Sequence, residues 1–171
     1  MLDFTPLEYV TKIQQLKYKT AVFPILLVII SFGLNFFFAL DLVKYLTLIG
    51  LVWYIIILMI FRIKRNYPPL SDSEIIVAPI YGKISKIEGN VITITKSYFQ
   101  PADLRYSGVN TTTDFDSTRV RYFEADPQLT GRLIGVVPAK TKCTCEIPID
   151  WGINVNVGEK VVAGGTILAM I

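Results

Sequence analysis

Two long apolar blocks lie almost end to end near the N-terminus of the chain. No charged residue occurs between Ala21 and Leu40 or between Tyr45 and Phe61, and only four residues separate the two blocks. A helix of roughly 20 apolar residues crosses the hydrocarbon core of a bilayer. Each block is about long enough for one crossing, so the pattern predicts a two-helix membrane anchor over residues 20–62. A hairpin that enters only one leaflet is the alternative that hydropathy leaves open.

The charges beside these blocks predict which side of the membrane the rest of the chain occupies. Basic residues flank the outer ends of both blocks, whereas the short connection holds one lysine: Lys12, Lys17 and Lys19 before, Arg62, Lys64 and Arg65 after, Lys44 between. The positive-inside rule therefore predicts an integral membrane protein with both termini and its β domain in the cytoplasm. A protein of the mitochondrial inner membrane facing the matrix would carry the same signals. A cleaved signal peptide is not expected, because no small-residue cleavage site follows the first block.

Polar and apolar residues near the first block give two finer expectations. Residues 1–19 place apolar side chains at positions 9, 10, 13 and 16, which lie on one helical face. This spacing predicts an amphipathic helix at the membrane surface. Within the first block, Ser31 and Asn35 are expected to hydrogen-bond to the second helix or to a partner.

Composition limits the remaining functions. The chain is 52% hydrophobic, which excludes a disordered protein, and it contains no histidine, the commonest general base and metal ligand. The net charge of +3 belongs to the membrane flanks, because residues 71–171 hold ten basic and eleven acidic residues. Nucleic-acid binding is therefore not expected. Cys143 and Cys145 are predicted to be small buried side chains on one face of a strand.

Beyond residue 62 the pattern changes to that of a β-rich soluble domain. Residues 63–73 contain two prolines with Ser and Asp and predict a linker. The domain, residues 74–171, is predicted to be mostly β, a compact sandwich or barrel, with Gly108–Ser117 as a long exposed loop. The following runs are typical of strands: 74–78, 83–87, 91–96, 120–123, 133–137, 141–147, 153–157 and 166–171.

Several segments of this domain resemble the phosphatidylserine decarboxylase family. Residues 61–65 read Phe-Arg-Ile-Lys-Arg, and residues 76–84 read Ile-Val-Ala-Pro-Ile-Tyr-Gly-Lys-Ile. They are similar to the family's Phe-Arg-Asp-Pro-x-Arg and Ile-Val-Ser-Pro-Ala-Asp-Gly-Lys-Val. Residues 101–105 resemble its Pro-Leu-Asp-Val-His segment, and residues 157–169 its closing segment. Small members of the family also begin with a short membrane anchor.

The resemblance implies a catalytic set of Asp, His and Ser, in which the serine cleaves its own chain and leaves a pyruvoyl group. In this chain the matching positions are Tyr81, Arg105 and, after Lys140, Thr141. Tyrosine does not supply an anionic carboxylate near neutral pH, and arginine cannot accept a proton. Threonine keeps a hydroxyl and would leave a 2-oxobutanoyl group if it cleaved the chain. Lys140 could serve as its base only if burial lowered its pKa strongly.

The closing segment also resembles the last hairpins of biotinyl and lipoyl domains, which are barrel-sandwich hybrids. Together the resemblances imply a flattened β-sandwich or barrel of one of these two types. Neither Lys83 nor Lys160 has the neighbours of a biotin- or lipoyl-carrying lysine. No cofactor is expected, apart from a 2-oxobutanoyl or pyruvoyl-type group if the chain is cut at Thr141.

Three functions remain at this stage. The first is a membrane-anchored, decarboxylase-like protein that has lost its catalytic set and acts in lipid-surface binding or assembly. The second is a divergent phospholipid decarboxylase that processes itself at Thr141, and the third is a β-sandwich adaptor bound to other subunits of a membrane complex. Arg105, Arg119 and Arg121 are weighed as a phosphate-binding cluster against simple solvated charges.

Overall fold

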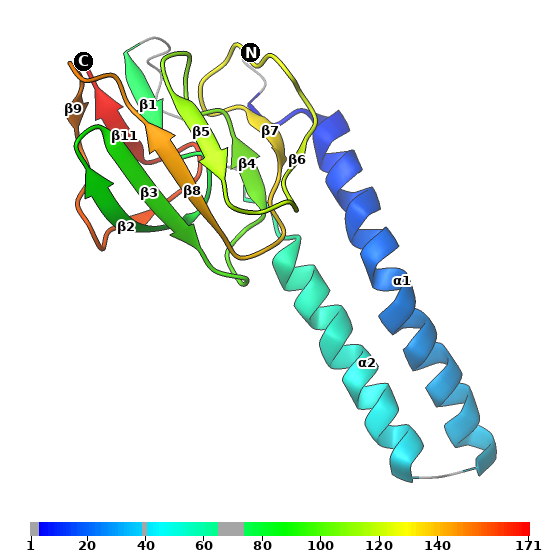
Figure 1. Ribbon diagram of the computed structural model, residues 1–171. Helices are drawn as coiled ribbons and strands as arrows, with labels where there is room; N and C mark the ends of the chain where they lie inside the picture. Colours follow the sequence, from blue (N-terminus) through cyan, green and yellow to red (C-terminus); the bar gives the residue numbers. More distant parts are fainter. Residues whose placement is uncertain (1–3, 39–40, 65–73) are drawn as a thin grey trace.

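The structure is a computed structural model that describes residues 4–38, 41–64 and 74–171. Helices α1 (Leu7–Phe38) and α2 (Asp41–Ile60) form an antiparallel hairpin that projects from a mostly-β domain (Figure 1). This combination confirms the coarse fold class predicted from the sequence. The strands are β1 (Ile75–Val77), β2 (Gly82–Glu88), β3 (Val91–Lys96), β4 (Asp103–Arg105), β5 (Thr112–Phe115), β6 (Arg121–Tyr122), β7 (Leu133–Val136), β8 (Thr141–Glu146), β9 (Gly152–Ile153), β10 (Lys160–Val161) and β11 (Ile167–Met170).

Both helices are long and apolar enough to cross a bilayer. Only 17% of the apolar window of each helix is buried inside the protein. A core helix of a soluble protein would bury most of such a window, because exposed apolar surface is unfavourable in water. The large side chains that these helices expose include Phe23, Ile29 and Ile55.

Close packing of small and polar residues joins the two helices. Thr47 donates a hydrogen bond to Ser31 across the hairpin at 2.8 Å, which confirms the predicted role of Ser31. At Gly50 an added Cβ would lie 2.7 Å from a methyl carbon of Val28, so the backbones approach closely there. Asn35 makes no such bond, and its Oδ1 is buried without a partner among the described residues.

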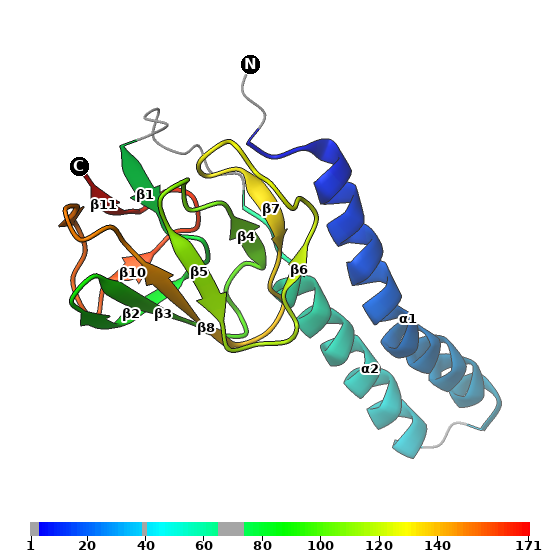
Figure 2. The same ribbon diagram turned by 45° about the horizontal axis from the view of Figure 1, so that its top comes forward.

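The first turns of α1 differ from the sequence expectation. The structure has one continuous helix from Leu7 to Phe38, not a separate amphipathic helix over residues 1–19. Its apolar face, with Tyr9 and Ile13 almost fully buried, packs against Leu133 and Val136 of β7. Figure 2 shows this part of α1 beside β6 and β7. The apolar face is therefore covered by the β domain, where the sequence analysis expected a membrane surface.

Three antiparallel sheets surround the main core of the β domain. Their strand orders are β1-β11-β9, β10-β2-β3-β8-β5 and β4-β7-β6. The predicted strand patterns explain the core, since alternate residues such as Ile92 and Ile94 of β3 point inward. Cys143 and Cys145 are free and buried there, as predicted, and burial raises the pKa of the Cys143 thiol.

Two predicted segments of the β domain turn out differently. Gly108–Ser117 is not simply an exposed loop, because β5 within it pairs with β8. Its Thr and Asp residues are typical of loops, but at a sheet edge one face of a strand is allowed to be polar. The alternating run 153–157 contributes only Ile153 to a strand, although Val155 in it is buried in the core. Most of the linker predicted over residues 63–73 lies outside the described residues. Ile63, at its start, packs against the cluster between α1 and the β domain that contains Tyr9, Ile13 and Leu133.

We predict that Gly50→Val separates the helices of the hairpin, because a side chain at this position meets Val28 and the Pro24 carbonyl. The reporter is a Ser31→Cys/Thr47→Cys pair, which replaces the two hydroxyls that lie within hydrogen-bond distance. In membranes the pair should cross-link on mild oxidation, and Gly50→Val should reduce the yield. Gly33→Val is the matched control, since nothing lies within 4 Å of a Cβ there. Equal losses from both valines would contradict close packing at Gly50.

Candidate functional site

Arg105, at the position of the family's histidine, is fully buried at the end of strand β4. Its guanidinium donates to the carbonyl oxygens of Lys64 at 2.9 Å, Gly131 at 3.0 Å and Phe4 at 3.4 Å. Phe4 precedes α1 and Lys64 follows α2, so this one side chain holds both ends of the helical hairpin. Its Nε is buried without a partner among the described residues.

Asp103 on the same strand completes this contact. Its carboxylate pairs with the Arg105 guanidinium at 3.3 Å, and both side chains are fully buried. The backbone N–H of Lys64 donates to the two carboxylate oxygens, at 3.3 Å each. Burial raises the pKa of Asp103, and the positive charge of Arg105 opposes that shift. We call Asp103 and Arg105 the hairpin clamp.

The chain closes tightly around the clamp. Gly164 has a φ of +68°, a conformation that favours glycine, and an added Cβ would lie 2.5 Å from Cδ of Arg105. Gly164 lies in the segment that resembles the family's closing sequence, so one role of that sequence here is to make room for the arginine.

A third buried charge, Lys96, lies beside the clamp. Its ammonium group donates to the backbone carbonyls of Gln100 at 3.2 Å and Ser97 at 3.4 Å. Burial lowers the pKa of Lys96 from 10.5 to about 8, and the charge of Asp103 opposes that shift. With this pKa, Lys96 still holds its proton for the most part at neutral pH, so it lies beside the clamp as a cation and loses its proton above about pH 8. Lys96 was not predicted as a site residue from the sequence, although it continues the inward alternation of Ile92 and Ile94.

Tyr81, at the position of the family's aspartate, also lies near the clamp. It is buried, with 5% of its surface exposed, in the turn before β2. The Lys64 ammonium lies 5.9 Å from the centre of its ring, and the Lys64 carbonyl is bound by Arg105. Tyr81 and Arg105 therefore both lie beside Lys64, Tyr81 near its ammonium group and Arg105 at its carbonyl.

Thr141, at the position of the family's serine, begins strand β8 directly opposite Lys96 on β3. Its hydroxyl does not bond to that lysine. It donates to the carboxylate of Asp116 at 2.7 Å, and the same oxygen accepts the backbone N–H of Lys142 at 2.8 Å. The hydrogen bond from Thr141 is the main cause that lowers the pKa of Asp116.

Lys140 is not placed as the buried general base that the sequence hypothesis required beside Thr141. Its side chain is exposed, whereas the hypothesis required a buried lysine. Asp116 is the better placed group, but it comes from 25 residues upstream through the β5–β8 pairing. No local sequence pattern links Asp116 to Thr141.

The three arginines weighed as a phosphate site separate into two places. Arg105 is buried in the hairpin clamp, whereas Arg119 and Arg121 are exposed. These two line a cavity of about 370 Å³ together with Leu16 of α1 and Ile57 of α2. Among the described residues, no group of three or more Cys, Asp or Glu gathers as a metal site.

Comparisons with protein-family models, with curated proteins and with solved structures found no match.

We predict that Arg105→Met destabilises the β domain by ~3–5 kcal/mol, because it leaves the Asp103 carboxylate buried without its cation. The double variant Asp103→Asn/Arg105→Met should be more stable than the single one. The measurement is urea unfolding in detergent, followed by Trp151 fluorescence in a Trp53→Phe background. Lys86→Met, which breaks an exposed pair with Glu88, should change stability by at most about 1 kcal/mol. An Arg105→Met protein as stable as the parent would contradict the clamp.

The lowered pKa of Lys96 predicts a specific pH dependence. Between about pH 8 and 10.5 the unfolded chain holds this proton and the folded chain does not, so stability should rise with pH. Relative to Lys96→Met, the unfolding free energy should increase by on the order of 1 kcal/mol per pH unit in this window and not below it. Taking the difference cancels the opposing titration of Cys143. Lys160→Met, at an exposed strand lysine, is the matched control variant, and a flat difference for Lys96→Met would refute the assignment.

Proposed function

We propose that the chain is a membrane-anchored relative of the phosphatidylserine decarboxylases that has lost decarboxylase activity and binds lipid at the cytoplasmic (or matrix) membrane surface. The observation that carries this proposal is the burial of Arg105. At the position where the family needs an accessible base, this chain has a guanidinium that is 0% exposed and bound to three carbonyls. That group holds the protein together and cannot take a proton from a nucleophile.

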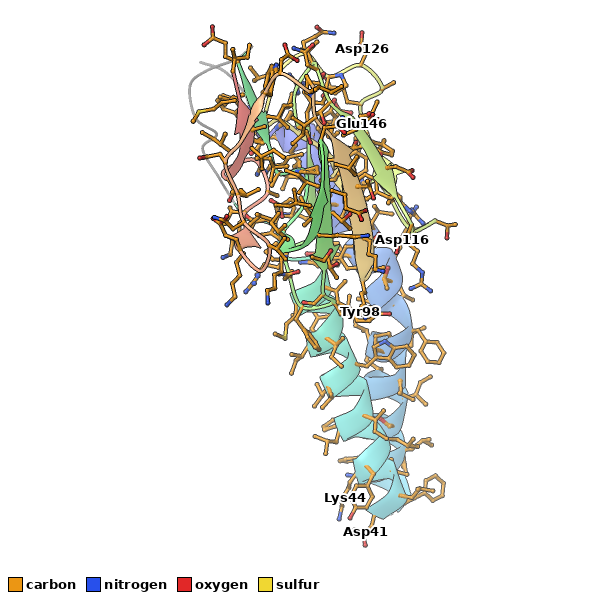
Figure 3. The ribbon with its side chains drawn as sticks, turned by 60° about the vertical axis from the view of Figure 1, so that its left-hand side comes forward. Asp41, Lys44, Tyr98, Asp116, Asp126 and Glu146 are labelled. Carbon is orange, nitrogen blue, oxygen red and sulfur yellow. The ribbon has the colours of Figure 1, made fainter. Side chains whose placement is uncertain are left out.

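Membrane insertion of the hairpin is supported by its exposed apolar surface and by the distribution of residues on the β domain. Tyr98 and Phe99, in the loop after β3, are 52% and 59% exposed. Figure 3 places Tyr98 at the end of the β domain that lies beside the helices, and Asp126 and Glu146 at the opposite end. Exposed aromatic residues are enriched at membrane–water interfaces. An aromatic end toward the bilayer and an acidic end away from it fit a domain resting on the membrane.

A second function is favoured by one contact, the 2.7 Å hydrogen bond between Thr141 and Asp116. A hydroxyl that donates to a carboxylate is a nucleophile beside a base. In a self-processing decarboxylase the hydroxyl would attack the Lys140 carbonyl carbon and displace the Thr141 nitrogen, which gives an ester. Loss of the Thr141 α-proton would then expel Lys140 as a carboxylate, and water would release the nitrogen as ammonia to leave a 2-oxobutanoyl group. The same carboxylate also accepts the Lys142 N–H, and its pKa is lowered, so it is a weak base that already has a structural role at the start of β8.

We predict that the purified, detergent-solubilised protein has the mass of the intact chain and releases no carbon dioxide from phosphatidylserine. The test is intact mass spectrometry combined with an assay of carbon dioxide release. Self-processing would separate a 31-residue fragment running from Thr141 to Ile171, with a carbonyl-reactive end.

Thr141→Ala is the matched control, since it removes the hydroxyl. A chain break in the parent that is absent from Thr141→Ala and Asp116→Asn, together with carbon dioxide release, would establish the enzyme and end the proposal of lost activity.

A further inference from the structure

Two cavities open where the helical hairpin meets the β domain. The first, of about 370 Å³, is lined by Leu16 and Thr20 of α1, by Ile57 and Ile60 of α2, and by Arg119 and Arg121. The second, of about 400 Å³, includes Lys12 and Lys19. Leu16 and Arg121 line both cavities, so the two are neighbours. We call them together the juxtamembrane crevice.

The position of the crevice along the helices coincides with the ends of the apolar blocks. Thr20 immediately precedes the charge-free run that begins at Ala21, and Phe61, which also lines the first cavity, ends the second run. With the hairpin in a bilayer, the crevice lies at the level where hydrocarbon gives way to headgroups. The helices contribute the apolar side chains Leu16, Ile57 and Ile60 to its wall, and the β domain contributes Val136 and Pro138.

Cations occupy the side of the crevice formed by the β domain and the first turns of α1. Arg119, Arg121 and Lys19 form no ion pair among the described residues, whereas Lys12 pairs with Glu8. None of the described residues that line either cavity is acidic. Arginine forms paired hydrogen bonds with phosphate oxygens, and unpaired cations beside an apolar wall match an anionic lipid better than a soluble acid.

We propose that the juxtamembrane crevice binds one anionic glycerophospholipid of the surrounding leaflet. Its phosphodiester meets Arg119 and Arg121, with Lys19 nearby, and its acyl chains continue along Leu16, Ile57 and Ile60. This inference deepens the proposed function, because it names the class of lipid and the site that binds it, and it rests on that function in requiring the hairpin to be in a bilayer. The bound lipid lies between the helices and β6, and none of Tyr81, Arg105 and Thr141 lines either cavity.

The test uses the full chain in nanodiscs of phosphatidylcholine that contain phosphatidylglycerol as the minor lipid. Native mass spectrometry counts the lipids that stay on the protein after release. The parent should retain phosphatidylglycerol beyond its share of the bilayer, and Arg119→Gln/Arg121→Gln should lower that retention by about tenfold. Lys83→Gln/Lys160→Gln is the control, because it removes two exposed charges that face each other on β2 and β10 and line neither cavity.

Three results would overturn the assignment. The first is that the parent shows no preference for phosphatidylglycerol, and the second is that the control variant loses as much lipid retention as the arginine variant. The third is that inorganic phosphate binds the delipidated protein as strongly as the lipid is retained, which would indicate a general anion site. Incorporation into nanodiscs and the carbon dioxide assay report separately on the proposed function. The protein could incorporate into nanodiscs and release no carbon dioxide, and yet the parent could show no preference for phosphatidylglycerol. That combination would refute the lipid site and leave membrane anchoring and the loss of decarboxylase activity standing.

Discussion

The ion pair of Arg105 and Asp103 is the contact on which the arrangement of helices and β domain depends. Three carbonyls from distant parts of the chain converge on one guanidinium, and the N–H of Lys64 reaches its carboxylate partner. Two further backbone hydrogen bonds join the same segments: the N–H of Leu133 donates to the Phe4 carbonyl, and the N–H of Ala102 donates to the Arg62 carbonyl. Burying a charge pair is unfavourable unless its polar groups find partners. The hairpin ends supply two of the three carbonyls and the Lys64 N–H, so these bonds form only when the hairpin is docked, and Nε of Arg105 stays without a partner among the described residues.

This arrangement explains why an arginine suits position 105, where the resembled family has a histidine. An imidazole at position 105 could not donate to three carbonyls at once, because it has only two nitrogens. An arginine can, and in doing so it loses access to any substrate. The arginine thereby fixes the β domain to the helical hairpin at both Phe4 and Lys64. If the proposed function holds, position 105 attaches the β domain to the helices, whereas in the family that the sequence resembles it would take part in proton transfer.

The sequence predicted those features that depend on periodicity or on local spacing. The two charge-free blocks gave the hairpin, the position of Ser31 gave its contact across the hairpin, and alternation gave most strands and the buried cysteines. The same alternation also contained Lys96, because a lysine two residues after Ile94 faces the same side of the strand. It was missed because a lysine at a strand end is usually solvated.

Contacts between distant segments could not be predicted in this way. The Arg105 partners lie 101, 41 and 26 residues away, and Asp116 lies 25 residues from Thr141. Similarly, the apolar face of residues 9–16 is the same whether a membrane or a strand covers it, so only the fold decides between the two. Because β7 covers that face, the N-terminal part of α1 packs on the β domain beside β6. That placement brings Lys19 next to Arg121 and creates the crevice, so the lipid site follows from the same docking that buries Arg105.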